Sequence, residues 1–252
     1  MNLILKLVIE VQEFAFLTAQ ALLNIFRSPR YLKDMFIQMD MIGVGSIVIV
    51  ILTGFFTGGV LALQSASSLQ AFGAVHLTGQ LVSLSLVKEL GPVLTALMLA
   101  GRVGSGITSQ LGSMLVTEQI DAMRALGTDP TKKLVTPRVL ACTTMLPLLT
   151  VLADLFGLVG GWVIAFNTLH LNTNLYWSTA LQSLNYDHAL EGLLKPIVFG
   201  FIIGMVGCHF GLRTRGGTRG VGQNTTRSVV TASILVIMAD FFLSKIILEL
   251  TA

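Results

Sequence analysis

The sequence predicts an all-α membrane protein with one amphipathic N-terminal helix, five membrane-spanning helices and a short helix outside the membrane. Composition, five long apolar segments and the placement of basic residues predict it. Of 252 residues, 53% are hydrophobic and 12% are charged, against about 25% charged in a soluble domain. A chain of this length cannot hide so much apolar surface from water, so we expect lipid to be part of its solvent, with the whole chain forming one membrane domain.

Residues 1–30 are predicted to form a helix in the membrane interface. Polar side chains recur every three or four positions and make one narrow stripe on an otherwise apolar helix: Lys6, Glu10, Glu13, Gln20, Asn24 and Arg27. This pattern favours an interfacial helix over one packed flat on the rest of the protein. The helix is expected to end at Ser28-Pro29, because the residue before a proline avoids helical geometry.

Five apolar segments follow, each of about 20 residues or more, which is enough to cross about 30 Å of hydrocarbon as a helix. They are predicted over residues 41–63, 81–109, 139–166, 190–212 and 228–250. Three prolines, Pro92, Pro147 and Pro196, fall inside these spans. We expect them to kink helices whose neighbours satisfy the freed backbone groups.

The basic residues predict the orientation of the spans. The N-terminal region and the stretches 101–138 and 213–227 together hold 13 of the 16 Lys and Arg residues, whereas 64–80 and 167–187 hold none. Basic segments stay preferentially in the cytoplasm. The N-terminus is therefore predicted to be cytoplasmic, and five spans put the C-terminus on the outer side.

A short helix is predicted over residues 114–128, between the second and third spans. Val116, Ile120, Met123 and Leu126 recur at helical spacing and form one apolar face. Gly127 is a plausible end, since glycine commonly terminates helices. Such a helix can dock in a groove of a soluble partner, or be an ordinary surface helix, and periodicity alone does not separate these interpretations.

Five ionisable residues lie inside the apolar segments: Lys88, Glu89, Asp154, Lys195 and Asp240. Charges in a membrane usually face a bundle interior or a wet cavity. We expect these residues to form a paired network around a cavity that opens outwards, acting either as structural ion pairs or as substrate contacts. Since Lys88 and Glu89 lie about 100° apart on a helix, each is expected to bond to a different span.

Several activities are disfavoured by missing motifs. There is no GxxxxGK[ST] phosphate-binding loop, so we expect no ATP hydrolysis and no cofactor in this chain. The histidines and cysteines lack metal-ligand spacing, and Cys142 and Cys208 are interpreted as small buried apolar residues. The Arg cluster at 213–227 is explained by membrane orientation, so no nucleic-acid partner is expected.

Long ordered motifs give the chain a resemblance to the MlaE family of permeases, also called the YrbE family. The motifs are LVKELGPVLTA around Lys88 and Glu89, AGRVGS at 100–105, TEQIDAM at 117–123, GTDP at 127–130, GMVGC at 204–208 and TTR at 225–227, with Asp240 last. The resemblance covers roughly residues 30–250.

The resemblance also implies binding partners, which the spacing of residues in the sequence does not predict. Similar permeases form homodimers in the bacterial inner membrane, with the C-terminus in the periplasm. The dimer binds two ATPase subunits, which hold ATP and Mg, on the cytoplasmic side and a ring of MCE-domain proteins in the periplasm. Similar members move phospholipids between the inner and outer membranes. The helix after the second span matches their coupling helix, through Glu118, Gln119, Asp121, Arg124, Gly127 and Asp129.

The resemblance also implies site residues. Leu61, Leu69 and Phe72 match the family's lipid pocket, with Lys88 and Glu89 beside it, whereas Ser68 falls where that pocket is usually apolar. Lys195, Arg227 and Asp240 also match charged family positions, which adds Arg227 to the expected network. The expected function is lipid transport by a non-enzymatic permease subunit. The alternatives are a scaffold that anchors an MCE ring, and an intramembrane lipid-modifying enzyme, for which no nucleophile–base pair is present.

Overall fold

A computed structural model describes residues 3–26 and 31–251, and every regular element in those ranges is helical. Five helical stretches are long and apolar enough to cross a membrane: Leu32–Gln70, Val75–Val116, Thr131–Asn167, Tyr186–Leu212 and Gly217–Glu249. Each contains, to within one residue, the apolar segment predicted there. All five begin before the predicted segments because the flanking residues continue the helices beyond the apolar cores.

The first, fourth and fifth spans are single helices, whereas the second and third are built from several elements. α1 covers Leu3–Phe26, and the first span is α2 (Leu32–Gln70). The second span comprises η1 (Val75–Leu77), α3 (Thr78–Ser85), η2 (Leu86–Leu90), α4 (Gly91–Leu99), η3 (Ala100–Gly104) and α5 (Ser105–Val116). After α6 (Gln119–Ala125), the third span comprises η4 (Thr131–Val135) and α7 (Thr136–Asn167). After α8 (Thr173–Gln182), the fourth and fifth spans are α9 (Tyr186–Leu212) and α10 (Gly217–Thr251). Of these, η2, η3 and η4 are single turns of π-helix.

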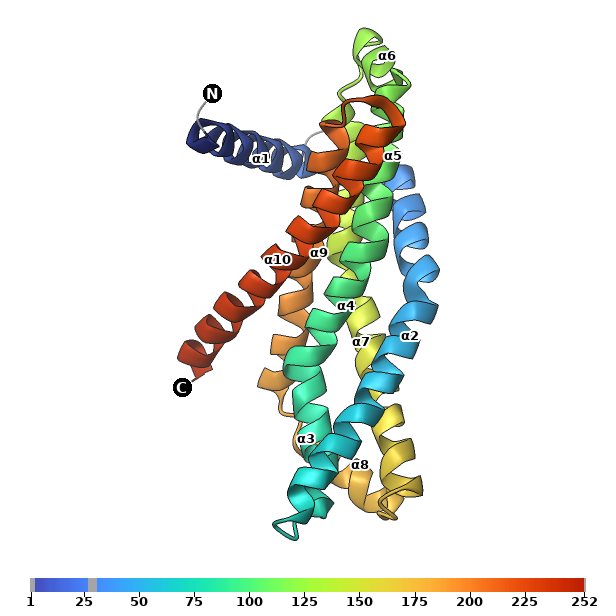
Figure 1. Ribbon diagram of the computed structural model, residues 1–252, viewed down its shortest axis with the longest axis vertical. Coiled ribbons are helices and arrows are strands. Elements are labelled where there is room, and N and C mark those ends of the chain that lie inside the picture. Colours follow the sequence, from blue (N-terminus) through green and yellow to red (C-terminus); the bar gives the residue numbers. More distant parts are fainter. Residues whose placement is uncertain (1–2, 27–30, 252) are drawn as a thin grey trace.

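The spans run along one long axis, and α10 leans away from the others towards its C-terminus (Figure 1). α1, α6 and the beginning of α10 lie at one end of the bundle, and α8 with the turn after α2 lies at the other (Figure 1). The described parts of the three basic segments therefore lie at one end of the bundle. α1 runs across the bundle axis, the direction that an interfacial helix takes beside spans that cross a membrane.

Glycines allow α2 and α7 to pack along each other at backbone distance. A Cβ atom on Gly54 would lie 2.3 Å from the carbonyl oxygen of Ala153, and one on Gly58 would lie 1.8 Å from that of Gly157. Small residues at helix interfaces are typical of membrane proteins, where close packing replaces the hydrophobic effect between helices. α2 and α7 thus form a tight pair on which the other spans assemble.

Helix α8 closes the end of the bundle opposite α6, in a connection for which the sequence predicted no helix. The hydroxyl of Tyr176 donates to the carbonyl oxygen of Leu158 at 3.1 Å, and the indole nitrogen of Trp162 donates to Thr173 at 3.3 Å. Burial raises the pKa of Tyr176, so its hydroxyl stays protonated and remains a donor. These bonds fix α8 against α7.

α1 contacts the end of α9 through one polar and one aromatic side chain. Glu13 forms an ion pair with Arg213, and the ring of Phe14 lies edge-on to His209 with centroids 5.3 Å apart. Val8 and Val11 of α1 are exposed. Part of the predicted polar stripe is therefore used to attach the helix to the bundle, while apolar side chains point outward. The predicted end at Ser28-Pro29 lies outside the described residues.

Candidate functional site

A turn of π-helix carries the first charged pair of the membrane interior. Lys88 and Glu89 lie in η2, which continues into α4 at Gly91-Pro92. A π-turn widens the helix locally and is frequent at functional sites. Both side chains reach α9, Lys88 to Glu191 at 3.4 Å and Glu89 to Lys195 at 2.9 Å. Glu89 also accepts from the hydroxyl of Ser244 on α10 at 3.1 Å. The expectation that each would bond to a different span therefore holds only in part: both side chains contact α9, and of the two only Glu89 also contacts α10.

Lys195 is the centre of the cluster. Its ammonium group is fully buried and lies 2.9 Å from Glu89, 3.3 Å from Glu191 and 3.5 Å from Asp240. It also donates to the backbone oxygen of Lys88 at 2.9 Å and to the hydroxyl of Ser244 at 2.8 Å. A buried ammonium ion needs such partners because desolvation otherwise disfavours its charge. Lys195 thus ties η2, α9 and α10 together.

The cluster contains two lysines and three carboxylates, and it is open on one side. Lys88 and Glu89 keep 33% and 43% of their side chains exposed, whereas Lys195 is 0% exposed. Glu191 and Ser244 belong to the cluster but were not predicted. Glu191 lies at the beginning of the predicted fourth span, four residues before Lys195, and that helical spacing is the signal that could have identified it.

Asp154 lies apart from this cluster, on α7. It is buried, and its Oδ1 has no hydrogen-bond partner among the described residues. A Cβ atom on Gly91 would lie 1.8 Å from this oxygen, so the carboxyl group packs directly on the backbone where η2 joins α4. The structure brings Lys88, Glu89, Lys195 and Asp240 together, whereas Asp154 lies on α7 and forms no ion pair with them.

The three apolar residues of the expected lipid pocket lie at the far end of α2 and in the turn that follows. Leu61 packs against a small core cluster that includes Val82 and Leu86, whereas Phe72 in the turn is 84% exposed. Three hollows of about 720, 350 and 120 Å³ in the described chain are lined by other residues. None of these three hollows joins Leu61, Leu69 and Phe72 to Lys88 and Glu89.

The helix predicted over 114–128 is divided in two. α5 continues to Val116, and Glu118, with a φ of 59°, turns the chain before α6 begins at Gln119. Ile120 of α6 is fully buried in the main core, whereas Leu126 is 83% exposed. The predicted apolar face is therefore split between an attachment to the bundle and an exposed tip.

The end of α6 is fixed by its own backbone. Gly127 adopts a φ of 76°, and the amide of Thr128 donates to Met123 at 3.0 Å, which completes the glycine-terminated cap that the sequence predicted. The carboxylate of Asp129 accepts from the amide of Thr131 at 2.8 Å and so caps the next helix. Arg124 pairs with Asp121 at 2.7 Å on the exposed surface.

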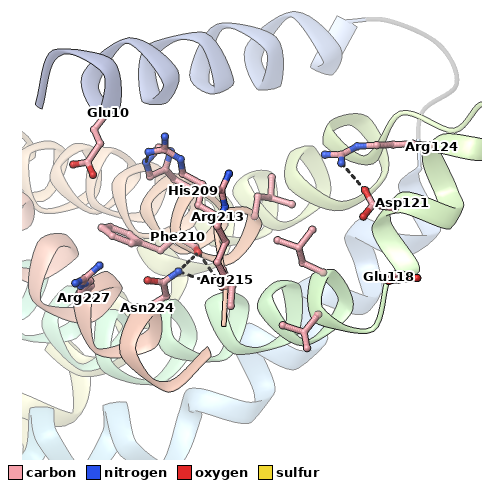
Figure 2. A pocket seen from close by; sticks show the side chains of 14 residues that line it. Glu10, Glu118, Asp121, Arg124, His209, Phe210, Arg213, Arg215, Asn224 and Arg227 are labelled. Atoms are coloured by element: carbon pink, nitrogen blue, oxygen red, sulfur yellow. Dashed lines mark hydrogen bonds and ion pairs between the residues drawn. The ribbon is translucent and has the colours of Figure 1, made fainter. Parts of the chain in front are cut away.

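Arg227 lies on the same helix as Asp240 of the charged cluster, α10, but it has different neighbours. It lines a cavity of about 720 Å³ between the end of α5, α6, the end of α9 and the beginning of α10. Figure 2 shows Arg227, Asn224 and Arg215 on one side of this cavity, Glu10 reaching down from α1, and the Asp121–Arg124 pair at the α6 side. The expectation that Arg227 joins the intramembrane network does not match this placement.

Comparison with known proteins identifies a family of membrane permeases. The family model described as "Permease MlaE" matches residues 35–246. A Synechocystis protein named "Probable ABC transporter permease protein" is 41% identical over 93% of this chain and 89% of its own length. A Rickettsia typhi protein with the same designation is 39% identical over 94% and 91%.

The "Intermembrane phospholipid transport system permease protein MlaE" of Haemophilus influenzae is 36% identical over 83% of this chain and 80% of its own length. The family-model match extends from the beginning of α2 almost to the end of α10, so it includes the charged cluster, α6 and nearly all of the five spans. The chain belongs to the MlaE permease family.

Proposed function

We propose that this chain is the membrane-spanning subunit of an ABC transporter that moves phospholipids between the inner and outer membranes. In this proposal lipid binds in a cavity that opens to the periplasm between two copies of the chain, and a separate ATPase drives the cycle. The H. influenzae relative named for intermembrane phospholipid transport supports the substrate class. The inner membrane, with the N-terminus in the cytoplasm and the C-terminus in the periplasm, is the proposed location.

The observation that carries the proposal is the half-open charged cluster around Lys195. Lys88 and Glu89 are partly exposed although they lie inside an apolar span. Charged groups in such a position face a wet cavity or another protein surface, since contact with lipid tails is costly. A phospholipid headgroup carries charges that such a cluster can meet, and the exposed apolar side chains nearby suit acyl chains.

A homodimer is supported by the surface that the single chain leaves uncovered. α10 is the least buried of the five spans, and it carries Asp240 of the cluster beside exposed apolar residues such as Phe241 and Phe242. A second copy would cover the partly exposed charges and enclose a cavity. Leu61, Leu69 and Phe72 would lie at the outer rim of that cavity, where an MCE-domain ring would dock.

Coupling to two ATPase subunits is assigned to α6. Its tip presents Leu126 and the Asp121–Arg124 pair, while Ile120 attaches the helix rigidly to the bundle core. A short helix with an exposed apolar tip can enter a groove of a soluble partner. A push on α6 would then reach α5 and the spans directly. ATP and Mg would be held by the partner, with no cofactor in this chain.

Reconstitution tests the proposal. The chain is reconstituted with its ATPase and MCE-domain partners, and transfer of a fluorescent phospholipid from donor to acceptor liposomes is measured with and without ATP. Glu89→Gln should lower ATP-dependent transfer about tenfold, which corresponds to the loss of one charge-assisted contact. Asp187→Asn, in the exposed first turn of α9, also removes one negative charge, is the matched control and should keep the wild-type rate.

The rival functions give different results in the same assay. A scaffold for an MCE ring would assemble normally and show no ATP-dependent transfer. A lipid-modifying enzyme would convert the lipid without ATP, which mass spectrometry of the liposomes would detect. Normal transfer by Glu89→Gln, with normal assembly, would remove the charged cluster from the transport path.

A further inference from the structure

A second hollow adjoins the Arg-lined cavity of Figure 2 and has a different character. The polar cavity, about 720 Å³, lies between α6 and the α9–α10 turn. The second hollow, about 350 Å³, lies between α1 and α9, and its walls include the apolar side chains of Phe16, Leu17 and Leu212. The two share His209, Leu212 and Arg213 as lining residues. A polar hollow and an apolar one thus lie side by side and share part of their walls, an arrangement that suits the two ends of an amphiphilic ligand.

The polar cavity has positive charge without a partner. Arg124 and Arg213 are paired with Asp121 and Glu13, respectively, but Arg215 and Arg227 form no ion pair with any described residue. Asn224, between them in sequence, is held by the oxygens of Phe210 and Thr214 at 3.2 and 3.3 Å. Two unpaired guanidinium groups match a phosphate, whose oxygens accept bidentate hydrogen bonds from arginine.

Carboxylates are also present in the cavity, and they limit where an anion can bind. Glu118 lies at the α6 side and Glu10 extends from α1 (Figure 2). Because the wall made by the α9–α10 turn and the beginning of α10 carries Arg215 and Arg227, which have no ion-pair partner among the described residues, a phosphate is expected there. The cavity volume falls in the range of about 300–1,000 Å³ that small-ligand sites occupy.

We propose that this paired cavity binds one phospholipid of the cytoplasmic leaflet, with its phosphate at Arg215 and Arg227 and an acyl chain in the hollow beneath α1. The site lies at the basic end of the bundle, where α1 crosses the bundle axis (Figure 1). Basic pockets between membrane helices on the cytoplasmic side are known to bind lipid headgroups. This site is separate from the outer cavity of the proposed transport path, and it depends on the proposed orientation only.

The proposed coupling helix lines the same cavity, through Glu118, Asp121 and Arg124. The lipid would thus occupy a cavity that lies between α1 and α6, the helix that meets the ATPase in the proposed complex. A segment of the ATPase subunit inserted in the cavity is the competing occupant.

Native mass spectrometry of the full-length chain, without any ATPase subunit, tests the site. The delipidated chain is titrated with phosphatidylglycerol, with diacylglycerol of the same acyl chains, and with inorganic phosphate. We expect Arg215→Gln/Arg227→Gln to weaken phosphatidylglycerol binding at least about tenfold, since charge-assisted hydrogen bonds are lost. Arg219→Gln/Lys245→Gln removes the same charge outside the cavity and should bind as the wild type does. Equal binding by both double variants would overturn the proposal.

The other arms separate the sources of the signal. Equal retention of diacylglycerol would show that the phosphate contributes nothing, and displacement of the lipid by millimolar phosphate would indicate a site for free phosphate; either result overturns the proposal. Photocrosslinking of the unaltered chain with a phospholipid that carries a diazirine in its acyl chain needs no variant. Labelling should fall on the α1 peptide that contains Phe16 and Leu17. Absence of label there, with label confined to α2 and α10, would contradict the site while leaving the transport proposal intact.

Discussion

Lys195 is the residue on which the interior of the membrane domain depends most. Its single ammonium group faces Glu89, Glu191 and Asp240 from three helical segments and is fully buried. Sequence could predict that the charges at 88, 89, 195 and 240 belong together, because each interrupts an apolar span. It could not predict that Asp154 would pack on Gly91, since that contact depends on the pairing of α7 with the second span.

Replacing Lys195 with methionine should destabilise the chain by about 3–5 kcal/mol, because three carboxylates lose their common partner in a buried site. The midpoint of unfolding in mixed dodecyl sulfate micelles measures the effect. Lys245→Met is the control: its pair with Glu249 spans 3.9 Å and is largely exposed, so a change of at most about 0.5 kcal/mol is expected. Similar midpoints for both variants would mean that the cluster adds no stability.

Glu118 adopts a left-handed backbone conformation at the beginning of α6, with a φ of 59°. This conformation costs a side-chain-bearing residue about 1–2 kcal/mol, whereas glycine adopts it freely. Glu118→Gly should therefore increase the protection of α6 amides in hydrogen exchange. Gln119→Gly removes a side chain one residue later, inside the helix, and should decrease it by about 0.5–1 kcal/mol. Changes of the same sign in both variants would contradict this account of the turn.

At the scale of elements, the existence of the spans could be predicted from the sequence and their ends could not. Apolar length marks the part inside lipid, whereas α2 and α5 continue past it with residues that carry no such signal. The π-helical turns were not predicted either, because no simple sequence pattern indicates where a helical turn contains an extra residue. α8 was missed since its 10 residues have neither apolar length nor clear periodicity.

The α2–α7 contact offers the sharpest test at this scale. A methyl group on Gly58 would meet the carbonyl oxygen of Gly157 at 1.8 Å, so the two backbones must move apart. Gly58→Ala should cost about 1–3 kcal/mol, as overpacking does in other tight interfaces. Gly106→Ala, on α5, places its methyl group in open space and should keep or slightly raise thermal stability in detergent, since glycine inside a helix is about 0.5–1 kcal/mol less favourable than alanine. Equal melting of the two variants would show that the helices tolerate separation.

At the scale of the whole molecule, the basic residues predict how the bundle is oriented in the membrane. The basic segments meet at the α6 end of the bundle, and the two connections without Lys or Arg meet at the α8 end (Figure 1). The sequence predicted which connections share an end, because the positive-inside rule applies to each connection separately. The structure places these connections at two ends but contains no membrane, so an experiment must determine which end faces the cytoplasm.

Single cysteines at exposed positions provide that test, because Cys142 and Cys208 are both buried and should react slowly. Leu126 at the tip of α6, Phe72 after α2 and Tyr186 at the beginning of α9 are 83%, 84% and 94% exposed. In intact spheroplasts a membrane-impermeant maleimide should label Phe72→Cys and Tyr186→Cys, while Leu126→Cys should react only after lysis. The reverse pattern would invert the orientation and move the phospholipid site at Arg215 and Arg227 to the outer leaflet. Labelling of Leu126→Cys and Phe72→Cys from the same side would contradict the five-span arrangement itself, since an odd number of spans must separate α6 from the turn after α2.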